Sequence, residues 1–142
     1  MQHATAKDLP AVLELLEANK LPIAGVQDHL EYFWLEFEYN NLIGCAGLEV
    51  HNQAGLLRSL AVDTNHRSHG LGKKLIQAVL EQAKANHLSS ISLLTETAQD
   101  YFPRFGFQTS TRDALPTSLH ASAEFRGACP DSAIAMTLRL EH

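Results

Sequence analysis

The sequence predicts an α/β (α+β) fold class, with one domain in which helices flank a mixed, mostly antiparallel central sheet. Two observations lead to this class. Apolar residues recur at helical spacing in two segments, and three strand-like segments separated by turns lie between them. Hydrophobic residues make up 45% of the 142 residues and charged residues 19%, as in an ordinary globular domain. No repeat or linker-like stretch divides the chain, so we expect one domain over residues 1–139 and treat residues 140–142 as a candidate tag remnant.

The first half of the chain is expected to form a helix and then three strands. Asp8 is typical of a helix cap and Pro10 of a first turn, and the helical spacing continues to about residue 19. A loop over residues 21–25 and a short helix over residues 27–30 follow. Strands are predicted over residues 31–39, 42–51 and 56–62.

The second half is expected to begin with an amphipathic helix over residues 71–86. Its inward side chains are predicted to be Leu75, Ile76, Val79, Leu80 and Ala83. A buried strand over residues 90–96 and a short helix that ends at Gly106 follow, and Phe107 begins another strand. The last predicted elements are a short helix over residues 118–125 and a strand over residues 132–140.

Charge, cysteine content and hydropathy argue against several classes of protein. The formal net charge of −5 gives no general electrostatic support to a nucleic-acid partner. Cys45 and Cys129 lie far apart without CxxC spacing, which argues against a disulfide scaffold or zinc site and fits a reducing cytoplasm. No apolar run approaches the roughly 18 residues that span a bilayer, and the N-terminus lacks the apolar region of a signal peptide. We therefore expect a cytoplasmic protein without bound metal, nucleic acid or membrane.

The segment HRSHGLGKKL combines two glycines with basic residues where a predicted strand leads into a helix. A helix N-terminus presents unpaired N–H groups to anions, and Gly70 and Gly72 let the backbone approach phosphate oxygens. The basic side chains are Arg67, His69, Lys73 and Lys74. Alternatively, the glycines only interrupt a loop and the lysines solvate the first helical turn. Lysines oppose the helix dipole there, which favours a bound anion, although the pattern is neither GxGxxG nor a P-loop.

A longer pattern around this segment resembles a known family. LAVDTNHRSHGLGKKL resembles the acetyl-CoA-binding motif of the GNAT superfamily of N-acetyltransferases, with a strand that ends at Val62 followed by Arg67, Gly70 and Gly72. The family's later signature, which ends in Gly-Phe, is matched by residues 98–107. The segments GCAGLEV, LRSLAV and LLTETAQDYFPRFGF look most like the small N-acetyltransferases of bacterial arsenic-resistance operons. They resemble more loosely the acetyltransferase domain of N-acetylglutamate synthase.

The resemblance implies a GNAT fold, acetyl-CoA as co-substrate and no metal. It implies that the third and fourth predicted strands splay apart and that the pantetheine arm of acetyl-CoA enters the gap. Backbone groups of Leu60 and Val62 would pair with this arm. The residues that would bind the pyrophosphate are Arg67, Ser68, His69, Gly70, Leu71, Gly72 and Lys73. The implied acceptor is the amine of a small amino-acid-like molecule, and a toxic analogue of glutamate is one candidate.

Glutamate itself is disfavoured as the acceptor, because residues 21–25 carry no positive charge where the glutamate enzymes have a basic segment. Two other interpretations stay open. The acceptor could be a protein N-terminus or lysine, or the chain could bind coenzyme A without turnover. The expected partner is a small-molecule amine, and a homodimer is the candidate assembly.

Glu49 and Arg58 are the candidate acceptor-site residues on the second and third predicted strands. A turn centred between Gln53 and Ala54 would place them opposite each other. Glu49 could then take a proton from the amine, and Arg58 could bind the acceptor's carboxylate. The alternative is a cross-strand ion pair worth only about 0.2–1 kcal/mol.

Tyr101 is the candidate acid that would protonate the departing thiolate. Many members of the family place a tyrosine at the aromatic position of the second motif, but here that position is Phe102 and Tyr101 precedes it. The alternative role of Tyr101 is packing. Water could then protonate the thiolate, or the thiolate could leave without an acid. Cys129 could line the acceptor pocket or be structural.

Overall fold

The computed structural model describes residues 1–67 and 69–141 and contains a 7-stranded sheet with the strand order β1-β2-β3-β4-β5-β7-β6. The strands are β1 (Gln2–His3), β2 (Phe33–Glu38), β3 (Asn41–His51), β4 (Ala54–Val62), β5 (Ser90–Thr95), β6 (Gln108–Ser110) and β7 (Ile134–Arg139). All neighbouring strands are antiparallel except β4 and β5, which are parallel. The predicted mixed, mostly antiparallel sheet is therefore confirmed.

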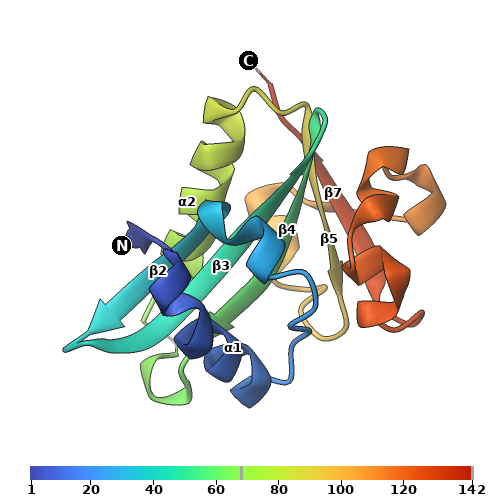
Figure 1. Cartoon of the computed structure of the whole chain (residues 1–142). Coiled ribbons are helices and arrows are strands. Elements are labelled where there is room, and N and C mark those ends of the chain that lie inside the picture. Colours follow the sequence, from blue (N-terminus) through green and yellow to red (C-terminus); the bar gives the residue numbers. More distant parts are fainter. Residues whose placement is uncertain (68, 142) are drawn as a thin grey trace.

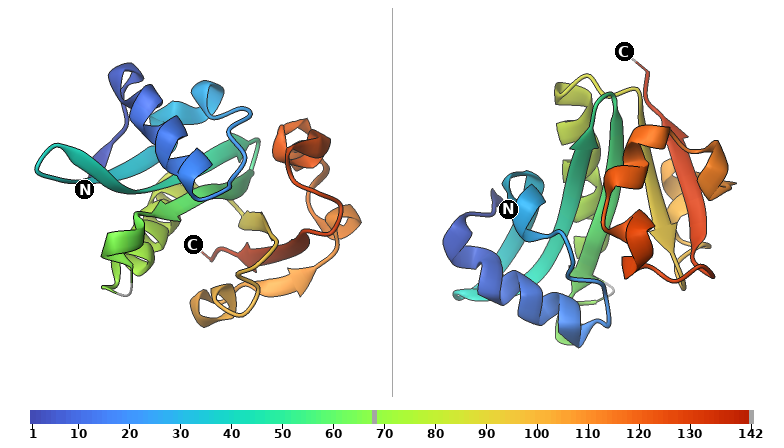
Figure 2. Two further views of the ribbon diagram at one scale, coloured as in Figure 1. Left: turned by 90° about the horizontal axis from the view of Figure 1, so that it is seen from below. Right: turned by 45° about the vertical axis from the view of Figure 1, so that its right-hand side comes forward.

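Helices cover both faces of the sheet (Figure 1, Figure 2). α2 (Leu71–Ala85) packs on one face, where its buried side chains join those of β3, β4 and β5 in the larger core cluster. α1 (Leu9–Ala18) lies on the other face of β3 and β4 and shares a second cluster with β2. The alternation of side chains along the strands supplies both clusters, because successive residues face opposite sides of the sheet.

Several short helical turns lie between these elements. The 3-10 turns are Ala6–Asp8, Gln27–Tyr32, Thr64–His66, Phe102–Phe105, Arg112–Ala114 and Thr117–Ala121. The short helix predicted over residues 118–125 is interrupted, because Ser122 is extended and a separate wide turn, Glu124–Ala128, follows it. None of the described helices is long and apolar enough to cross a membrane.

Details at both ends of the chain differ from the sequence-based expectations. The two-residue strand β1 was not predicted, and the Asp8 carboxylate does not cap α1 but accepts hydrogen bonds from Thr5 N–H at 2.8 Å and Thr5 Oγ1 at 3.1 Å. Leu80 is only partly buried. Leu140 is buried and its N–H donates to the Ser89 carbonyl at 2.9 Å, so the fold includes this residue rather than ending at 139. His142 lies outside the described residues.

The sheet splits between β4 and β5. The two strands pair only where Ala54, Gly55 and Leu56 meet residues 90–92, at the start of both strands. Beyond Leu56 they diverge, and β5 continues its pairing with β7 over its whole length (Figure 2). The expected splaying of the third and fourth predicted strands is therefore confirmed, and it opens the middle of the sheet.

β4 also carries a bulge at the point where it leaves β5. Cys45 pairs with Ala61 and Gly47 pairs with Arg58, so β4 has one more residue than β3 in this interval. Ser59 takes up the extra length with a φ of +60°, and its carbonyl accepts a hydrogen bond from the Cys45 thiol at 3.2 Å. A bulge re-aims the strand locally, here where the sheet opens.

Candidate functional site

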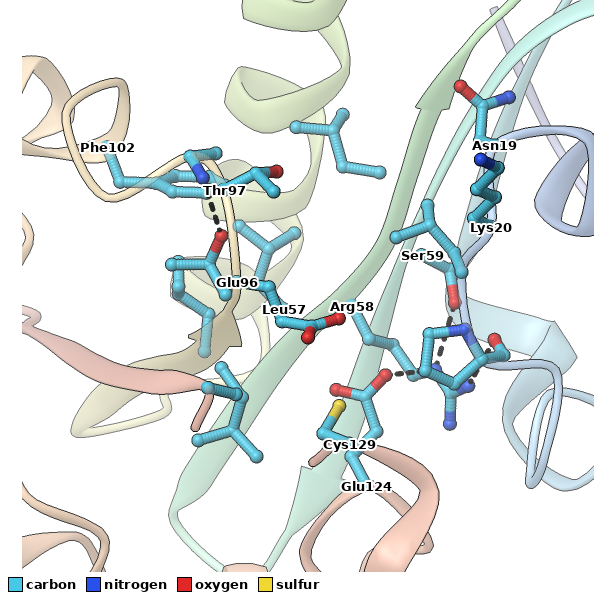
Figure 3. Close-up of a pocket in the computed structure, with 18 residues that line it drawn as sticks. Asn19, Lys20, Leu57, Arg58, Ser59, Glu96, Thr97, Phe102, Glu124 and Cys129 are labelled. Atoms are coloured by element: carbon cyan, nitrogen blue, oxygen red, sulfur yellow. Dashed lines mark hydrogen bonds and ion pairs between the residues drawn. The ribbon is translucent and has the colours of Figure 1, made fainter. Parts of the chain in front are cut away.

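A cavity of about 440 Å³ occupies the opening between β4 and β5 (Figure 3). Its walls come from four parts of the chain: residues 19–22 after α1, residues 57–60 of β4, residues 93–98 with Phe102 around the end of β5, and the tail residues Glu124, Cys129 and Ala133. We call this the acceptor cavity. Both apolar and charged side chains line it, so it can hold a small polar molecule against an apolar wall.

A second hollow of about 430 Å³ lies at the start of α2. It is lined by Val62, His66, Arg67, Gly70, Leu71, Gly72, Lys73, Tyr101 and Arg104. We call this the α2 hollow. It brings together most of the residues that the sequence assigned to pyrophosphate binding, but His69 is not among those that line it, and Ser68 lies outside the described residues. Leu60 lines the acceptor cavity and Val62 the α2 hollow, so the two spaces follow one another along β4.

Gly70 gives the α2 hollow its shape. Its φ of +80° is a left-handed conformation that favours glycine, and no side chain caps the N-terminus of α2 among the described residues. The first N–H groups of α2 are thus available to an anion, and the helix dipole adds positive potential. Arg67 lies beside them, where its guanidinium donates to the Val62 carbonyl at 3.3 Å and to Asn19 Oδ1 at 2.6 Å.

Three buried charges stand beside the acceptor cavity. Arg58 Nη1 donates to Glu49 Oε2 at 2.7 Å. Arg58 Nε lies 3.6 Å from Glu124 Oε2 (Figure 3). The side chains of Arg58 and Glu49 are 0% exposed and that of Glu124 is 5% exposed. Arg58 also donates through Nε to Ser59 Oγ at 3.0 Å and through Nη2 to the Pro22 carbonyl at 3.3 Å.

The register of β3 and β4 differs from the prediction, although the ion pair forms. Glu49 pairs with Leu56, and Arg58 pairs with Gly47, because the turn at residues 52–53 is tighter than expected. Glu49 and Arg58 are therefore diagonal neighbours rather than opposite residues. A long arginine side chain reaches its partner across this diagonal.

Glu49 lies behind Arg58 and is not among the residues that line the acceptor cavity. Glu49 Oε1 forms a hydrogen bond with His51 Nε2 at 2.7 Å and lies 3.3 Å from His29 Nε2. Burial acts to raise the pKa of Glu49, but hydrogen bonds from His51 and Arg58 outweigh it and hold the pKa below its usual value. Glu49 is thus a weak base with both oxygens engaged.

His29, Glu49 and His51 present ligand atoms within 4.8 Å of one another, a donor set that divalent transition metals accept. The sequence spacing gave no sign of this group, because His29 comes from a turn that precedes β2. Arg58 already places a positive charge on the Glu49 carboxylate. The hydrogen bonds of Glu49 with His51 and Arg58 therefore account for the position of these side chains without a metal ion.

Glu124 was not identified as a site residue from the sequence. Burial raises its pKa to about 7, while Arg58 acts in the opposite direction. The Cys129 thiol is hydrogen-bonded to it, and burial together with the Glu124 charge raises the pKa of Cys129 to about 12. No periodic pattern in the sequence pointed to Glu124, because it reaches the cavity through the irregular turn Glu124–Ala128.

The model of the acetyltransferase (GNAT) family matches residues 5–107. The chain belongs to this family.

Relatives of this GNAT chain include amino-acid acetyltransferases. The amino-acid acetyltransferase of Neisseria meningitidis serogroup A is 28% identical over 125 residues, covering 82% of this chain and 29% of that protein. The amino-acid acetyltransferase of Mycobacterium tuberculosis is 28% identical over 118 residues, covering 75% of this chain and 67% of that protein. The chain thus spans less than a third of the length of the Neisseria enzyme.

A solved structure shares the fold. N-acetylglutamate synthase from Neisseria gonorrhoeae, complexed with coenzyme A and N-acetyl-glutamate, matches with a TM-score of 0.84 and 23% identity. The match covers 99% of this GNAT chain and 35% of that chain.

Tyr101 and Phe102, adjacent aromatic residues of the second GNAT motif, line different spaces. Phe102 is buried and lines the acceptor cavity, whereas Tyr101 lines the α2 hollow. A Cβ added at Gly72 would lie 3.3 Å from the Tyr101 hydroxyl, and the Arg104 guanidinium lies 4.6 Å from the centre of the Tyr101 ring. The tyrosine hydroxyl thus points to the start of α2.

Proposed function

We propose that this GNAT chain transfers an acetyl group from acetyl-CoA to the amine of a small amino-acid-like acceptor. The observation that carries the proposal is the opening between β4 and β5, which holds a small, partly charged cavity that follows the α2 hollow along β4. Such an opening provides one space for the phosphates of a donor and another for an acceptor. Family membership supports the same chemistry.

The donor is proposed to lie across both spaces. The N–H groups at the start of α2, from His69 to Lys73 in the described chain, would bind the pyrophosphate, and Arg67 would add a cation. The pantetheine arm would follow the β4 edge at Leu60 and Val62, since no strand pairs with this part of β4 on the β5 side among the described residues. The thioester would then reach the acceptor cavity.

The acceptor is proposed to be small and to carry both signs of charge. The cavity volume suits an amino acid rather than a folded protein segment. Arg58 and Lys20 supply positive charge in its lining, and Glu96 and Glu124 supply negative charge. We propose that Arg58 binds the acceptor's carboxylate, a role limited by the two contacts that its Nη atoms already make with Glu49 and Pro22.

The reaction is proposed as direct transfer. The neutral amine attacks the thioester carbonyl, the tetrahedral oxyanion forms, and the C–S bond breaks to release the thiolate. Because the Tyr101 hydroxyl points to the start of α2 and Phe102 lines the acceptor cavity, we propose that transfer depends on positioning more than on a tyrosine acid.

A thiol-release assay tests the proposal. The purified protein is incubated with acetyl-CoA and a panel of amino acids, glutamate analogues that contain arsenic or phosphorus, and peptide amines. Release of coenzyme A with one class of small amine supports the proposal and names the acceptor. Release with peptide amines alone would indicate a protein acetyltransferase, and tight acetyl-CoA binding without release would indicate a binding module.

A further inference from the structure

Two buried carboxylates share a single guanidinium in this protein. Arg58 lies 2.7 Å from Glu49 and 3.6 Å from Glu124, so only the Glu49 contact is within hydrogen-bond distance. A buried charge without an opposite partner is strongly destabilising. Glu49 already balances Arg58, which leaves Glu124 as the surplus acidic group.

Glu124 has few partners for a buried carboxyl group. Its carboxyl group lies 3.6 Å from Arg58 Nε and is hydrogen-bonded to the Cys129 thiol, which is a weak donor. A structural carboxylate in this position is expected to receive several strong hydrogen bonds, as Glu49 does. A poorly bonded acid in the wall of a cavity is instead typical of a functional group.

The carboxylate of Glu124 is directed into the acceptor cavity. It comes from the tail, while Arg58 approaches it from β4 and Cys129 lies beside it (Figure 3). Two acidic residues line this cavity within the described chain, Glu96 and Glu124, and Glu96 is exposed. Glu49, the base suggested by the sequence, does not line it.

We infer that Glu124 is the general base that takes a proton from the acceptor's ammonium group, directly or through one water. The inference rests on the proposed acetyl transfer. One N–H proton moves to a Glu124 oxygen, the freed lone pair forms the N–C bond, and the C–S bond breaks. The second nitrogen proton leaves as the tetrahedral intermediate collapses and ends on the thiolate, while Glu124 returns its proton to solvent.

The titration of Glu124 fits this role. Its pKa of about 7 means that a substantial fraction is ionised at neutral pH and that the carboxylate is still basic enough to accept a proton. An incoming ammonium group would favour the ionised form further. The charged or titratable groups around it are Arg58 and Cys129 beside it, Glu49 on the far side of Arg58, Lys20 and Glu96 in the same lining, His29 and His51 behind Glu49, and Arg112 near Cys129.

Kinetics of the full chain with its identified amine test the inference. We expect Glu124→Gln to lower kcat by about 10²–10⁴-fold and to leave the Kd for acetyl-CoA, measured by calorimetry, within about twofold. In the unmodified protein kcat/KM should rise with pH through an inflection near 7, and this inflection should be absent in Glu124→Gln. Glu124→Asp should recover part of the rate, because it restores a carboxylate. Glu81→Gln, on the exposed face of α2, is the matched control.

Several results would overturn the inference. Glu124→Gln could keep more than a tenth of the kcat, or keep the inflection near pH 7. Glu96→Gln or Glu49→Gln could cause the loss instead, which would assign the base to that residue. If the unmodified protein binds acetyl-CoA but acetylates no amine in the panel, the proposed function itself fails and the role of Glu124 fails with it.

Discussion

At the scale of single residues, Arg58 connects the parts of the chain that surround the acceptor cavity. Its guanidinium contacts Glu49 on β3, the Pro22 carbonyl after α1 and Glu124 in the tail. No other described residue has side-chain contacts with all three. The residue is therefore structural whether or not it also binds an acceptor.

Replacing Arg58 should test both roles. Arg58→Ala leaves two buried carboxylates without a cation, so we expect the free energy of unfolding to fall by about 3–5 kcal/mol, measured by urea denaturation. Arg139→Ala, the control, removes an exposed arginine at the end of β7 and should change the free energy of unfolding by less than about 0.5 kcal/mol. If Arg58 binds the acceptor's carboxylate, the acceptor KM should also rise; an effect on stability alone would leave only the structural role.

Gly72 is the residue at which the donor assignment can be tested most directly. Gly72→Glu places a side chain and a negative charge within the α2 hollow, so we expect acetyl-CoA to lose its stabilising effect in a thermal-shift measurement. Gly72→Ala is the matched control, because its Cβ meets only the Tyr101 hydroxyl at 3.3 Å. A full shift in Gly72→Glu would remove the pyrophosphate from this hollow.

Tyr101 can be tested by deleting one oxygen. Tyr101→Phe keeps the ring contacts with Phe102 and Phe105, at 5.6 and 5.4 Å between centroids, and the stacking of Arg104. Because the hydroxyl points to α2 rather than into the acceptor cavity, we expect kcat to stay within a few-fold in the thiol-release assay. A loss of a hundredfold or more would restore Tyr101 as the acid for the thiolate.

At the scale of elements, the bulge in β4 directly follows Arg58, where the strand runs on without β5 beside it. Ser59 holds a left-handed conformation in the middle of a strand, which costs about 1–3 kcal/mol for a non-glycine residue. Its hydroxyl also accepts the hydrogen bond from Arg58 Nε. The strand thus holds strain at the point where the sheet opens.

Substitutions at Ser59 should separate these two contributions. Ser59→Val combines a β-branched side chain with a positive φ, so we expect it to lower the free energy of unfolding by about 2 kcal/mol or more. Ser59→Gly relieves the strain while losing the hydroxyl, so its effect should lie within about 1 kcal/mol of zero. Chemical denaturation of the two variants side by side measures the difference, and equal stabilities would mean that the bulge relaxes when its residue changes.

The same strand shows what could and could not be predicted from the sequence. The segments that form α2, β3 and β5 were located correctly. α2 has helical periodicity over 15 residues, and β3 and β5 are largely buried apolar runs. The register of β3 and β4 was wrong, since one extra residue at Ser59 and a tight turn leave no periodic signal. Most of the α2 hollow comes from residues 62–73, and this local segment could be recognised in the sequence. Glu124 instead reaches the cavity through the packing of an irregular tail.

At the scale of the whole molecule, the site lies where the sheet is least continuous. α2 and β4 supply the proposed donor side, while β5 and the tail supply the far wall of the acceptor cavity. A ligand that fills the opening would therefore link two parts of the sheet that share only the short Ala54–Leu56 pairing. Two of the groups around this opening, the buried carboxyl group of Glu124 and the left-handed Ser59, act against the stability of the fold.

The pH dependence of folding should reveal the cost of burying the ionised carboxylate of Glu124. Its pKa is about 7 in the fold and near 4.5 when exposed, so between these values the folded chain holds a proton that the unfolded chain has lost. Stability is therefore lost as pH rises through this window, by up to about 3 kcal/mol. Glu124→Gln has no charge to bury, so we expect it to unfold at nearly the same temperature as the unmodified protein at pH 5 and at a clearly higher temperature at pH 8. Glu81→Gln should show no such divergence, and parallel curves for Glu124→Gln would mean that Arg58 keeps the carboxylate ionised throughout.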